Sequence, residues 1–210
     1  MSPLSNQSQL TEIILLRHAT STRERDGQWG RLYDAPLGTS YKGELGNALS
    51  NLGQRQVPRV HSSPLLRCTL TARHVFPDSE IILVDDLRAY HSGIFEGLTE
   101  SEVLRAYPNY VNLPYKDRFL HPRFGEESIE SQARRVSCGL EAILSADVED
   151  VVVIVAHFST INVIAHIALG NLDPRTFADG AFDIAPGDFL SLSVALPQIK
   201  DHLSELLKKE

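Results

Sequence analysis

Two histidines that could do chemistry each come directly after a run of apolar residues. His18 follows Arg17 at the end of the run 13–16, and His157 follows the run 151–156. In parallel α/β sheets, side chains just beyond the carboxyl ends of the strands meet the ligand. Two imidazoles at one sheet edge, with the Arg17 guanidinium beside one of them, predict an anion site. Either histidine alone could instead end its strand and hydrogen-bond locally.

A third segment contributes a second arginine. Ser62, Ser63 and Pro64 precede a helical stretch whose first turn carries Arg67. Helix N-termini attract anions, and a planar guanidinium binds two phosphate oxygens at once. Arg67 alone would be an ordinary surface side chain. Beside the two strand-end histidines, it predicts a pocket for a phosphate group.

The elements that would position these residues alternate along the chain. The expected strands span 13–16, a short segment before 63, 81–84, 151–156 and 189–196, and the expected helices span 52–60, 66–75, 99–107, 128–144 and 160–169. Thr99 and Glu102 fit a capping box, whereas Pro58 conflicts with the end of the first of these helices. Such alternation predicts a sheet with helices on both faces.

Two long, turn-rich segments, 23–47 and 107–124, interrupt this alternation. Long loops in compact domains often serve as lids or binding loops. We therefore expect their side chains to set the choice of substrate.

The composition indicates one globular domain over residues 1–210, with 1–10 as a flexible N-terminal segment. The chain is 42% hydrophobic and 22% charged, which is enough to bury a substantial core. No apolar run approaches the roughly 20 residues of a membrane span, and the polar start does not resemble a secretory signal, so we expect a soluble cytoplasmic protein. The net charge of −7 argues against nucleic-acid binding, so positive potential must be local. Cys68 and Cys138 stand in no metal-ligand spacing and are expected in the core.

Three segments resemble the signatures of the histidine phosphatase superfamily, which includes the cofactor-dependent phosphoglycerate mutases. The segment 16–21, Leu-Arg-His-Ala-Thr-Ser, is similar to the Arg-His-Gly signature, and 62–67 and 155–158 are similar to the second and third signatures. Weaker similarities, in family order, lie at 34–37, 49–53, 93–98 and 127–128. The resemblance covers about residues 13–169.

This resemblance implies a fold and a set of roles. The fold would be a phosphoglycerate mutase-like three-layer α/β/α sandwich, with a mostly parallel sheet and one antiparallel strand. His18 would attack phosphorus and form a phosphohistidine, which water then hydrolyses. Arg17, Arg67 and His157 would bind the transferring phosphoryl group, with no metal and no other cofactor. Further candidates for substrate contact are Thr20, Ser21 and the backbone amide of Phe158. The alternative for these three is local turn or cap hydrogen bonding.

One position departs from the family pattern. Ala89 stands two residues after Leu87, where relatives usually carry a glutamate that protonates the leaving oxygen and then activates water. Losing a general acid typically lowers the rate by about 10²- to 10⁴-fold. Either turnover is slow or another group supplies the proton, and an alanine introduced to trap bound substrate would look the same. The replacement candidates are Glu96, Glu126 and His91, each of which could equally be a surface or hinge residue.

The leading hypothesis is a phosphomonoester phosphatase of the histidine acid phosphatase type, acting on a small phosphorylated metabolite with turnover reduced by Ala89. A phosphoglycerate mutase-like phosphotransferase is one alternative, but such mutases tend to carry Trp-Asn where this chain has Thr22-Arg23. The other alternative is a phosphate-binding module without catalysis. The expected partner is a small phosphorylated substrate, with neither nucleic acid nor membrane, and homo-oligomer formation stays open.

Overall fold

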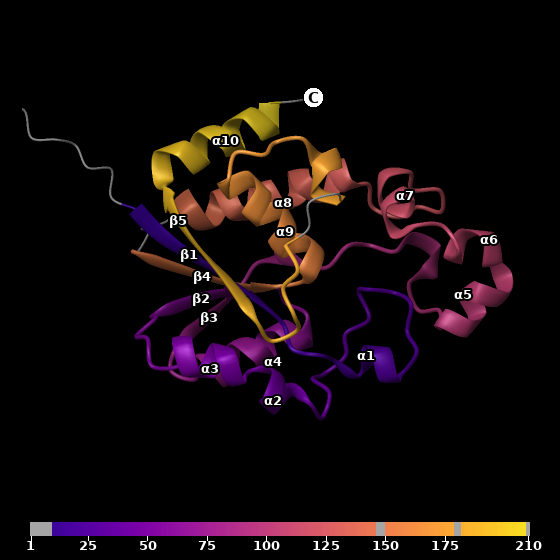
Figure 1. Ribbon diagram of the computed structural model, residues 1–210, viewed down its shortest axis with the longest axis horizontal. Coiled ribbons are helices and arrows are strands. Elements are labelled where there is room, and N and C mark those ends of the chain that lie inside the picture. The colour runs from indigo at the N-terminus through magenta and orange to yellow at the C-terminus, as the bar shows by residue number, and fades with distance from the viewer. Residues whose placement is uncertain (1–9, 146–149, 179–181, 209–210) are drawn as a thin grey trace, which may run out of the picture.

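The computed structural model describes residues 10–145, 150–178 and 182–208. Its strands form one sheet in the order β3-β2-β4-β1-β5 (Figure 1). The strands are β1 (Leu10–Arg17), β2 (Arg59–Ser62), β3 (Glu80–Leu83), β4 (Val151–Ala156) and β5 (Phe189–Ala195). Only β5 runs antiparallel to its neighbour β1 among these described strands, while the other pairs are parallel. The prediction of a mostly parallel sheet with one antiparallel strand is confirmed.

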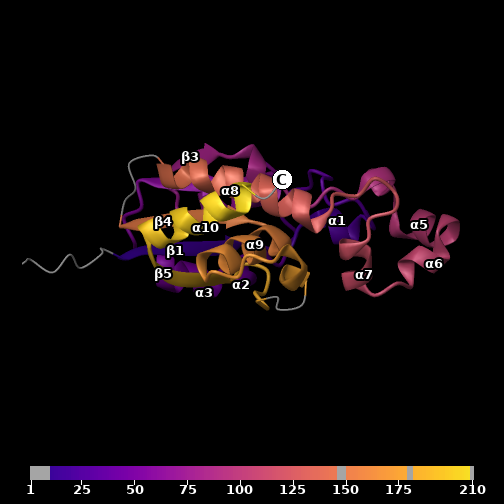
Figure 2. The same ribbon diagram turned by 90° about the horizontal axis from the view of Figure 1, so that it is seen from above.

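Helices cover both faces of this sheet and complete the three-layer α/β/α sandwich (Figures 1 and 2). One face carries α8 (Ile129–Ser145), α9 (Phe158–Ala168) and α10 (Leu196–Lys208), and the other carries α3 (Gly46–Leu52) and α4 (Leu66–Val75). Ile13 and Leu15 of β1 pack into the core on the α8 side, whereas Ile14 and Leu16 pack on the α4 side. A strand buried on both faces requires an unbroken apolar run, which explains the composition of 13–16.

The carboxyl ends of three parallel strands meet at one edge of the sheet. In the strand register, Arg17 of β1 pairs with Ala156 of β4, and Ser62 of β2 pairs with Val155 of β4. The residues that directly follow these strands are His18, Ser63 and His157. The register therefore brings two histidines from distant parts of the chain to the same edge.

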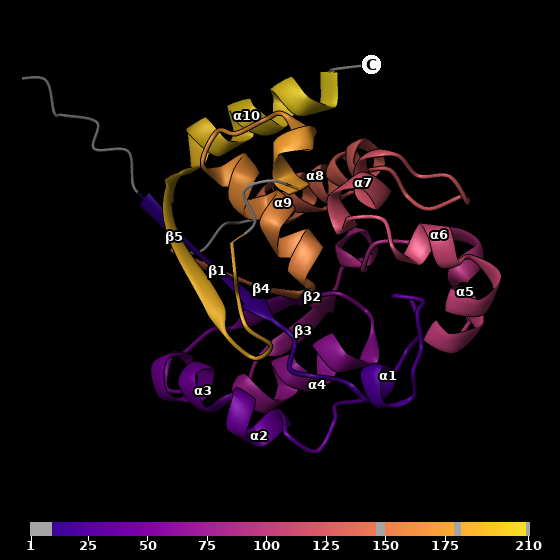
Figure 3. The same ribbon diagram turned by 45° about the vertical axis from the view of Figure 1, so that its right-hand side comes forward.

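A smaller helical unit lies beyond this edge (Figure 3). It contains α5 (Glu100–Ala106), α6 (Pro108–Val111) and α7 (Tyr115–Leu120), with α1 (Thr22–Arg25) nearby. The ring centroid of Phe95 lies 4.8 Å from that of Tyr110 and 5.3 Å from that of Tyr107, so aromatic packing holds the unit together. The remaining short helices of the described chain are α2 (Tyr41–Glu44) and the 3-10 turns Asp85–Leu87, Gly93–Phe95 and Pro174–Ala178. The segment 107–124, which we predicted as a turn-rich loop, therefore contains the two short helices α6 and α7.

Most predicted elements are confirmed with small shifts at their ends, but the helix predicted at 52–60 is wrong. Helix α3 already ends at Leu52, and the amide of Gly53 closes it by donating to the Leu49 carbonyl at 3.0 Å. Pro58 lies directly before β2. The apolar residues of this segment therefore belong partly to the preceding helix and partly to a strand.

Helix α10 has no counterpart among the predicted elements. Ile199, Leu203 and Leu206 are buried at helical spacing against the α8 side of the core. The spacing of apolar residues at the chain end was the available signal for α10.

The prediction that both cysteines lie in the core is wrong for Cys138, which is exposed on α8, while Cys68 is buried.

The capping box is confirmed in both of its hydrogen bonds. The Glu102 amide donates to the Thr99 hydroxyl at 3.3 Å, and the Thr99 amide donates to the Glu102 carboxylate at 2.8 Å. The N-terminal segment 1–10 lies outside the described residues except for Leu10, which begins β1. A single domain over the whole chain stays a prediction. No helix in the described ranges is long and apolar enough to cross a membrane.

Candidate active site

The structure brings His18 and His157 together. Their ring centroids lie 5.1 Å apart at an interplanar angle of 64°. His18 directly follows β1, and His157 follows the neighbouring strand β4 and caps the N-terminus of α9. The two imidazoles are therefore held by the most deeply buried part of the sheet.

The tautomer of His18 is fixed by its own turn. Its Nδ1 atom lies 2.8 Å from the carbonyl oxygen of Ala19, which can only accept, so Nδ1 carries the proton. The Nε2 atom therefore has a lone pair, and the Nε of Arg67 donates to it at 3.3 Å. Burial, together with the charge of Arg67, lowers the pKa of His18 to about 3. A neutral imidazole with an available Nε2 lone pair is the form that acts as a nucleophile.

Arg67 connects both imidazoles to the loop after β1. Besides its contact with His18, its Nη2 lies 3.3 Å from Nδ1 of His157. Its Nη1 donates to the Tyr33 carbonyl at 3.0 Å, and Nη2 donates to the Arg31 carbonyl at 2.8 Å. Arg67 lies in the first turn of α4 and is only 2% exposed. One buried guanidinium thus sets the relative position of the two histidines and of the loop.

The tautomer of His157 is the opposite of that of His18. Because Arg67 donates to its Nδ1, the proton resides on Nε2, which donates to the Ser63 hydroxyl at 2.8 Å. Burial lowers the pKa of His157 well below its ordinary value, and the positive charge of Arg67 acts in the same direction. Burial also raises the pKa of the adjacent Cys68 thiol to about 12, so the sulfur is no nucleophile.

Arg17 forms a second wall of the same cavity. Its Nη1 donates to the Ile184 carbonyl at 2.7 Å, and its guanidinium lies 5.1 Å from the centroid of the Phe158 ring. The residues that line the cavity are Arg17, His18, Arg23, Arg31, Arg67, Ala89, His157, Phe158 and Ser159. Four guanidiniums and two imidazoles therefore surround a single opening. A cavity of this composition attracts an anion.

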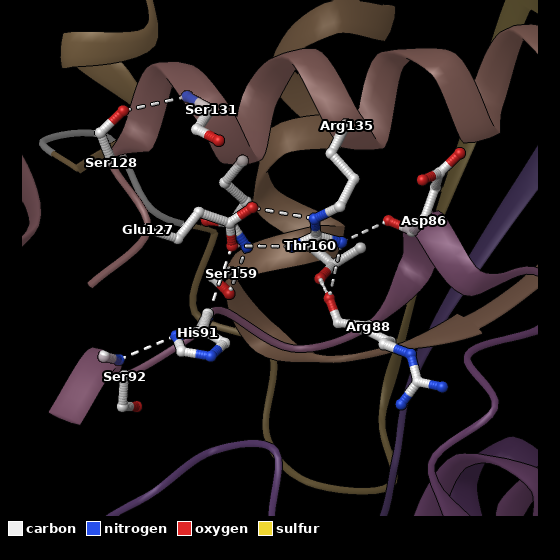
Figure 4. Close-up of polar contacts among 12 residues, drawn as sticks. Asp86, Arg88, His91, Ser92, Glu127, Ser128, Ser131, Arg135, Ser159 and Thr160 are labelled. Carbon is white, nitrogen blue, oxygen red and sulfur yellow. Dashed lines mark hydrogen bonds and ion pairs between the residues drawn. The ribbon is translucent and has the colours of Figure 1, made fainter. Parts of the chain in front are cut away.

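Ala89 forms part of this cavity wall, and Arg135 binds the backbone just before it, at Arg88 (Figure 4). Nη1 of Arg135 donates to the carbonyls of Asp86 and Arg88 at 2.6 and 3.2 Å. Its Nε and Nη2 bind both carboxylate oxygens of Glu127 at 2.9 and 2.8 Å. This arrangement holds in place the peptide group that joins Arg88 to Ala89.

The three candidate replacements for the missing acid lie outside the cavity lining. The carboxylate of Glu96 accepts from the Ser92 amide at 2.7 Å and from the Leu32 amide at 3.1 Å. Nδ1 of His91, an exposed residue, accepts from the Gly93 amide at 2.9 Å (Figure 4). Each group is already engaged with the backbone of its own surroundings.

Glu126 is the third of these candidates and lines a neighbouring cavity instead. It is hydrogen-bonded to the Tyr110 hydroxyl and to the amides of Arg123 and Phe124. Burial opposes its charge, but these hydrogen bonds outweigh burial and lower its pKa. A carboxyl group with a lowered pKa is ionised at neutral pH, so it carries no proton to give to a leaving oxygen.

Of the further contact candidates, Phe158 lines the cavity, whereas Thr20 and Ser21 do not. The Thr20 amide donates to the Glu44 carboxylate at 2.6 Å, and the Ser21 hydroxyl accepts from the Arg23 amide at 3.4 Å. The Ser21 contact is the local hydrogen bonding considered as the alternative, whereas the partner of Thr20 is 24 positions away, in helix α2.

Three cavity residues were not among the predicted site residues. They are Arg23, Arg31 and Ser159. The two arginines belong to the segment 23–47, which the sequence indicates as a binding loop. The sequence therefore predicts a binding role for this segment, but it does not show which of its side chains turn toward the histidines. In the described ranges, no group of three or more histidine, cysteine, aspartate or glutamate side chains is arranged to hold a metal ion.

Comparison with known proteins defines the class. A family model of the histidine phosphatase superfamily, branch 1, matches residues 13–192, so the chain belongs to this superfamily, as the resemblance predicted. Phosphoserine phosphatase 1 of Hydrogenobacter thermophilus is 29% identical over 154 residues, which are 70% of this chain and 71% of that protein. The family and the phosphatase relatives support a hydrolase of the phosphatase class.

Two other similarities agree with this assignment. The 6-phosphofructo-2-kinase/fructose-2,6-bisphosphatase of Caenorhabditis elegans is 29% identical over 150 residues, 69% of this chain but only 31% of that protein. The solved structure of mycobacterial glucosyl-3-phosphoglycerate phosphatase has a TM-score of 0.73 at 22% identity, over 88% of this chain and 90% of that chain. The second similarity shows a shared fold.

Proposed function

We propose that this protein is a phosphomonoester phosphatase that acts through a phosphohistidine on a small phosphorylated metabolite of the cytoplasm. The observation that carries the proposal is the hydrogen bond from Nδ1 of His18 to the Ala19 carbonyl. This bond leaves the lone pair of His18 on Nε2, within the arginine-lined cavity. The names of the relatives, which include phosphoserine phosphatase 1 and a fructose-2,6-bisphosphatase, support the reaction class.

The reaction proceeds in two displacements at phosphorus. Nε2 of His18 forms a bond to phosphorus as the bond between phosphorus and the leaving oxygen breaks. Water then attacks the phosphohistidine, which releases inorganic phosphate and restores the neutral imidazole. Arg17, Arg67 and the backbone amide of Phe158 at the N-terminus of α9 would donate to the phosphoryl oxygens as negative charge develops on them. The Nδ1–H of His18 instead donates to the Ala19 carbonyl.

The step of this reaction that lacks a proton donor is the departure of the leaving oxygen. Ala89 offers only a methyl group where an acid would stand, and Glu96, Glu126 and His91 are engaged elsewhere. An aryl oxygen leaves with little protonation, whereas an alkyl oxygen needs a proton from water or from the substrate itself. Aryl phosphates should therefore be the substrates that suffer least from Ala89.

The test is hydrolysis of 4-nitrophenyl phosphate by the wild-type chain and by His18→Asn. Asparagine keeps a hydrogen-bonding side chain of similar size but cannot form the phosphohistidine. The variant should lose all hydrolysis above background, while His91→Asn, which changes an exposed histidine outside the cavity, should retain it. Unchanged turnover in His18→Asn would refute the proposal.

A phosphate-binding module without catalysis is a second candidate, because Ala89 removes the acid from an otherwise complete anion cavity. Such a module would bind inorganic phosphate through Arg17 and Arg67 and would hydrolyse no phosphomonoester, aryl esters included. Calorimetric binding of phosphate without any turnover of 4-nitrophenyl phosphate would favour this candidate over the phosphatase.

A further inference from the structure

We infer that Arg23 and Arg31 form a second anion subsite, so that the natural ligand carries another anionic group besides the phosphoryl group bound at His18. That group is a carboxylate or a second phosphate. The inference rests on the proposed function only in that it takes the phosphoryl group to lie in the cavity beside His18, between the two arginines Arg17 and Arg67.

The first argument is the charge of the cavity. Arg17, Arg23, Arg31 and Arg67 line it together, and no carboxylate is among the described residues that do so. The whole chain has a formal charge of −7, so this positive surface is a local feature and not a reflection of a basic protein. Like charges gathered in a confined space repel one another, and an anionic ligand offsets that repulsion.

The second argument is the division of the four arginines into two pairs. Arg17 follows β1, and Arg67 donates to His18 itself, so this pair surrounds the nucleophile. Arg23 instead lies in α1 and Arg31 in the loop after it, and both also line a cavity that adjoins the one at His18. A phosphate monoester carries about two negative charges at neutral pH, which the first pair already balances.

The third argument is where Arg31 lies. It lines the His18 cavity and also two adjoining cavities, one with Tyr90 and Ser92 and the other with Trp29 and Arg118. The part of a ligand that extends beyond its phosphoryl group would enter this space. Arg23 lines the His18 cavity and the second of the adjoining ones. Both guanidiniums therefore lie where that extension would go.

Carboxylates do occur in the adjoining cavities. Glu126 lines the first, where it is bound to Tyr110 and to the amides of Arg123 and Phe124, and Glu100 lines the second. The charged residues that line the cavities beside Arg31 are therefore only arginines near His18, and arginines together with glutamates in the adjoining cavities. An anionic group of the ligand would be bound close to the histidines and not far out along the loop.

The fourth argument is that the loop is held in place. Arg67 donates to the backbone carbonyl of Arg31 at 2.8 Å, and Nη1 of Arg23 donates to the Gln28 carbonyl at 2.8 Å. The charge of Arg23 also contributes to the lowered pKa of His18, after burial, Arg67 and Arg17, and that of Arg31 contributes to the lowered pKa of His157. The backbone that carries Arg31 is therefore fixed relative to His18, and a fixed separation of two anion subsites selects a ligand by the distance between its anionic groups.

The test compares pairs of substrates that differ in one anionic group. Phosphoserine and phosphoethanolamine differ by a carboxylate, and fructose 1,6-bisphosphate and fructose 6-phosphate differ by a phosphate. Wild type should hydrolyse the more anionic member of at least one pair with the higher kcat/KM. The pair that shows the preference identifies the second group as carboxylate or phosphate.

The variants are Arg31→Gln and Arg23→Gln, with Arg105→Gln on the exposed side of α5 as the matched control. Glutamine leaves the backbone carbonyl of Arg31 available to Arg67. Loss of one charge-assisted hydrogen bond corresponds to about a 10- to 100-fold fall in kcat/KM. We expect that fall, mainly through KM, for the preferred anionic substrate, and less than about a twofold change for its partner lacking that group.

Two results would overturn the subsite. One is an equal loss for both members of each pair, which would mean that these arginines act on the phosphoryl group itself. The other is no loss for any substrate. If wild type hydrolyses none of these alkyl phosphates, hydrolysis of 4-nitrophenyl phosphate tests the phosphatase activity separately, and calorimetric binding of the same pairs to wild type and variants tests the subsite. The same affinity for both members of each pair would then overturn it.

Discussion

The Nε atom of Arg67 lies 3.3 Å from the Nε2 atom of His18, and it donates a hydrogen bond to the nitrogen that we propose as the nucleophile. The same guanidinium contacts His157 and two loop carbonyls. Arg67 therefore keeps the imidazole neutral and in position before a phosphoryl group arrives.

Replacement of Arg67 by lysine should lower kcat/KM for 4-nitrophenyl phosphate by about 100-fold or more, since an ammonium group cannot span both histidines and the loop. The matched control is Arg73→Lys, because Arg73 lies on the same helix and is exposed. Steady-state kinetics measure both variants. Equal activity of Arg67→Lys and wild type would contradict the positioning role.

Introduction of an acid at position 89 should restore turnover of poor leaving groups. Ala89 lines the cavity, and Arg135 holds its backbone, so Ala89→Glu should place a carboxyl group beside the leaving oxygen. We expect kcat for an alkyl phosphate to rise by about 10²- to 10⁴-fold and that for an aryl phosphate much less. Ala89→Gln has nearly the same shape without the acid, and an equal gain in that variant would mean that general acid chemistry is not the cause.

Loss of Arg135 should destabilise the chain and loosen the backbone beside the cavity. Arg135→Gln removes the guanidinium that binds both Glu127 oxygens and the Asp86 carbonyl, which we expect to lower the free energy of unfolding by about 1.5–3 kcal/mol. The Arg88 carbonyl keeps the hydrogen bond from the Thr160 hydroxyl. Urea unfolding measures the change. Arg175→Gln, which removes an exposed ion pair with Asp173, should have little effect, and an equal loss in both variants would contradict the distinction.

The stability of the fold should decrease as the pH falls below about 6.5. Burial lowers the pKa of His18 to about 3 and that of His157 well below its ordinary value. The unfolded chain therefore binds more protons than the folded chain in this range, and each such histidine contributes up to about 1.4 kcal/mol per pH unit. Urea unfolding between about pH 7 and 5 should show a smaller slope for His18→Asn. The wild-type slope in that variant would contradict the lowered pKa.

The sequence could predict those parts of the site that follow from strand ends. His18 and His157 each follow a buried strand, and parallel register alone brings them to one edge. The acceptor for Nδ1 of His18 could not be predicted, because it is the backbone carbonyl of Ala19. Side-chain types carry no information about such a partner.

The loop residues illustrate a second limit. Arg23 and Arg31 reach the cavity because hydrogen bonds fix the loop, including the one from Arg67 to the Arg31 carbonyl. Glu96 is near Ala89 in sequence, but its carboxylate accepts hydrogen bonds from the amides of Ser92 and Leu32. Sequence proximity could not distinguish these outcomes, since each depends on long-range contacts. The missed helix α10 and the wrong helix at 52–60 have a different cause, the ambiguity of short apolar patterns.

The most direct measurement is intact-protein mass spectrometry of the chain after rapid acid-free quenching during turnover of 4-nitrophenyl phosphate, followed by mapping of the modified residue. We predict a mass increase of one phosphoryl group, located on His18, present in His91→Asn and absent in His18→Asn. A phosphoryl group on any other residue, or steady hydrolysis by His18→Asn, would contradict the proposed mechanism.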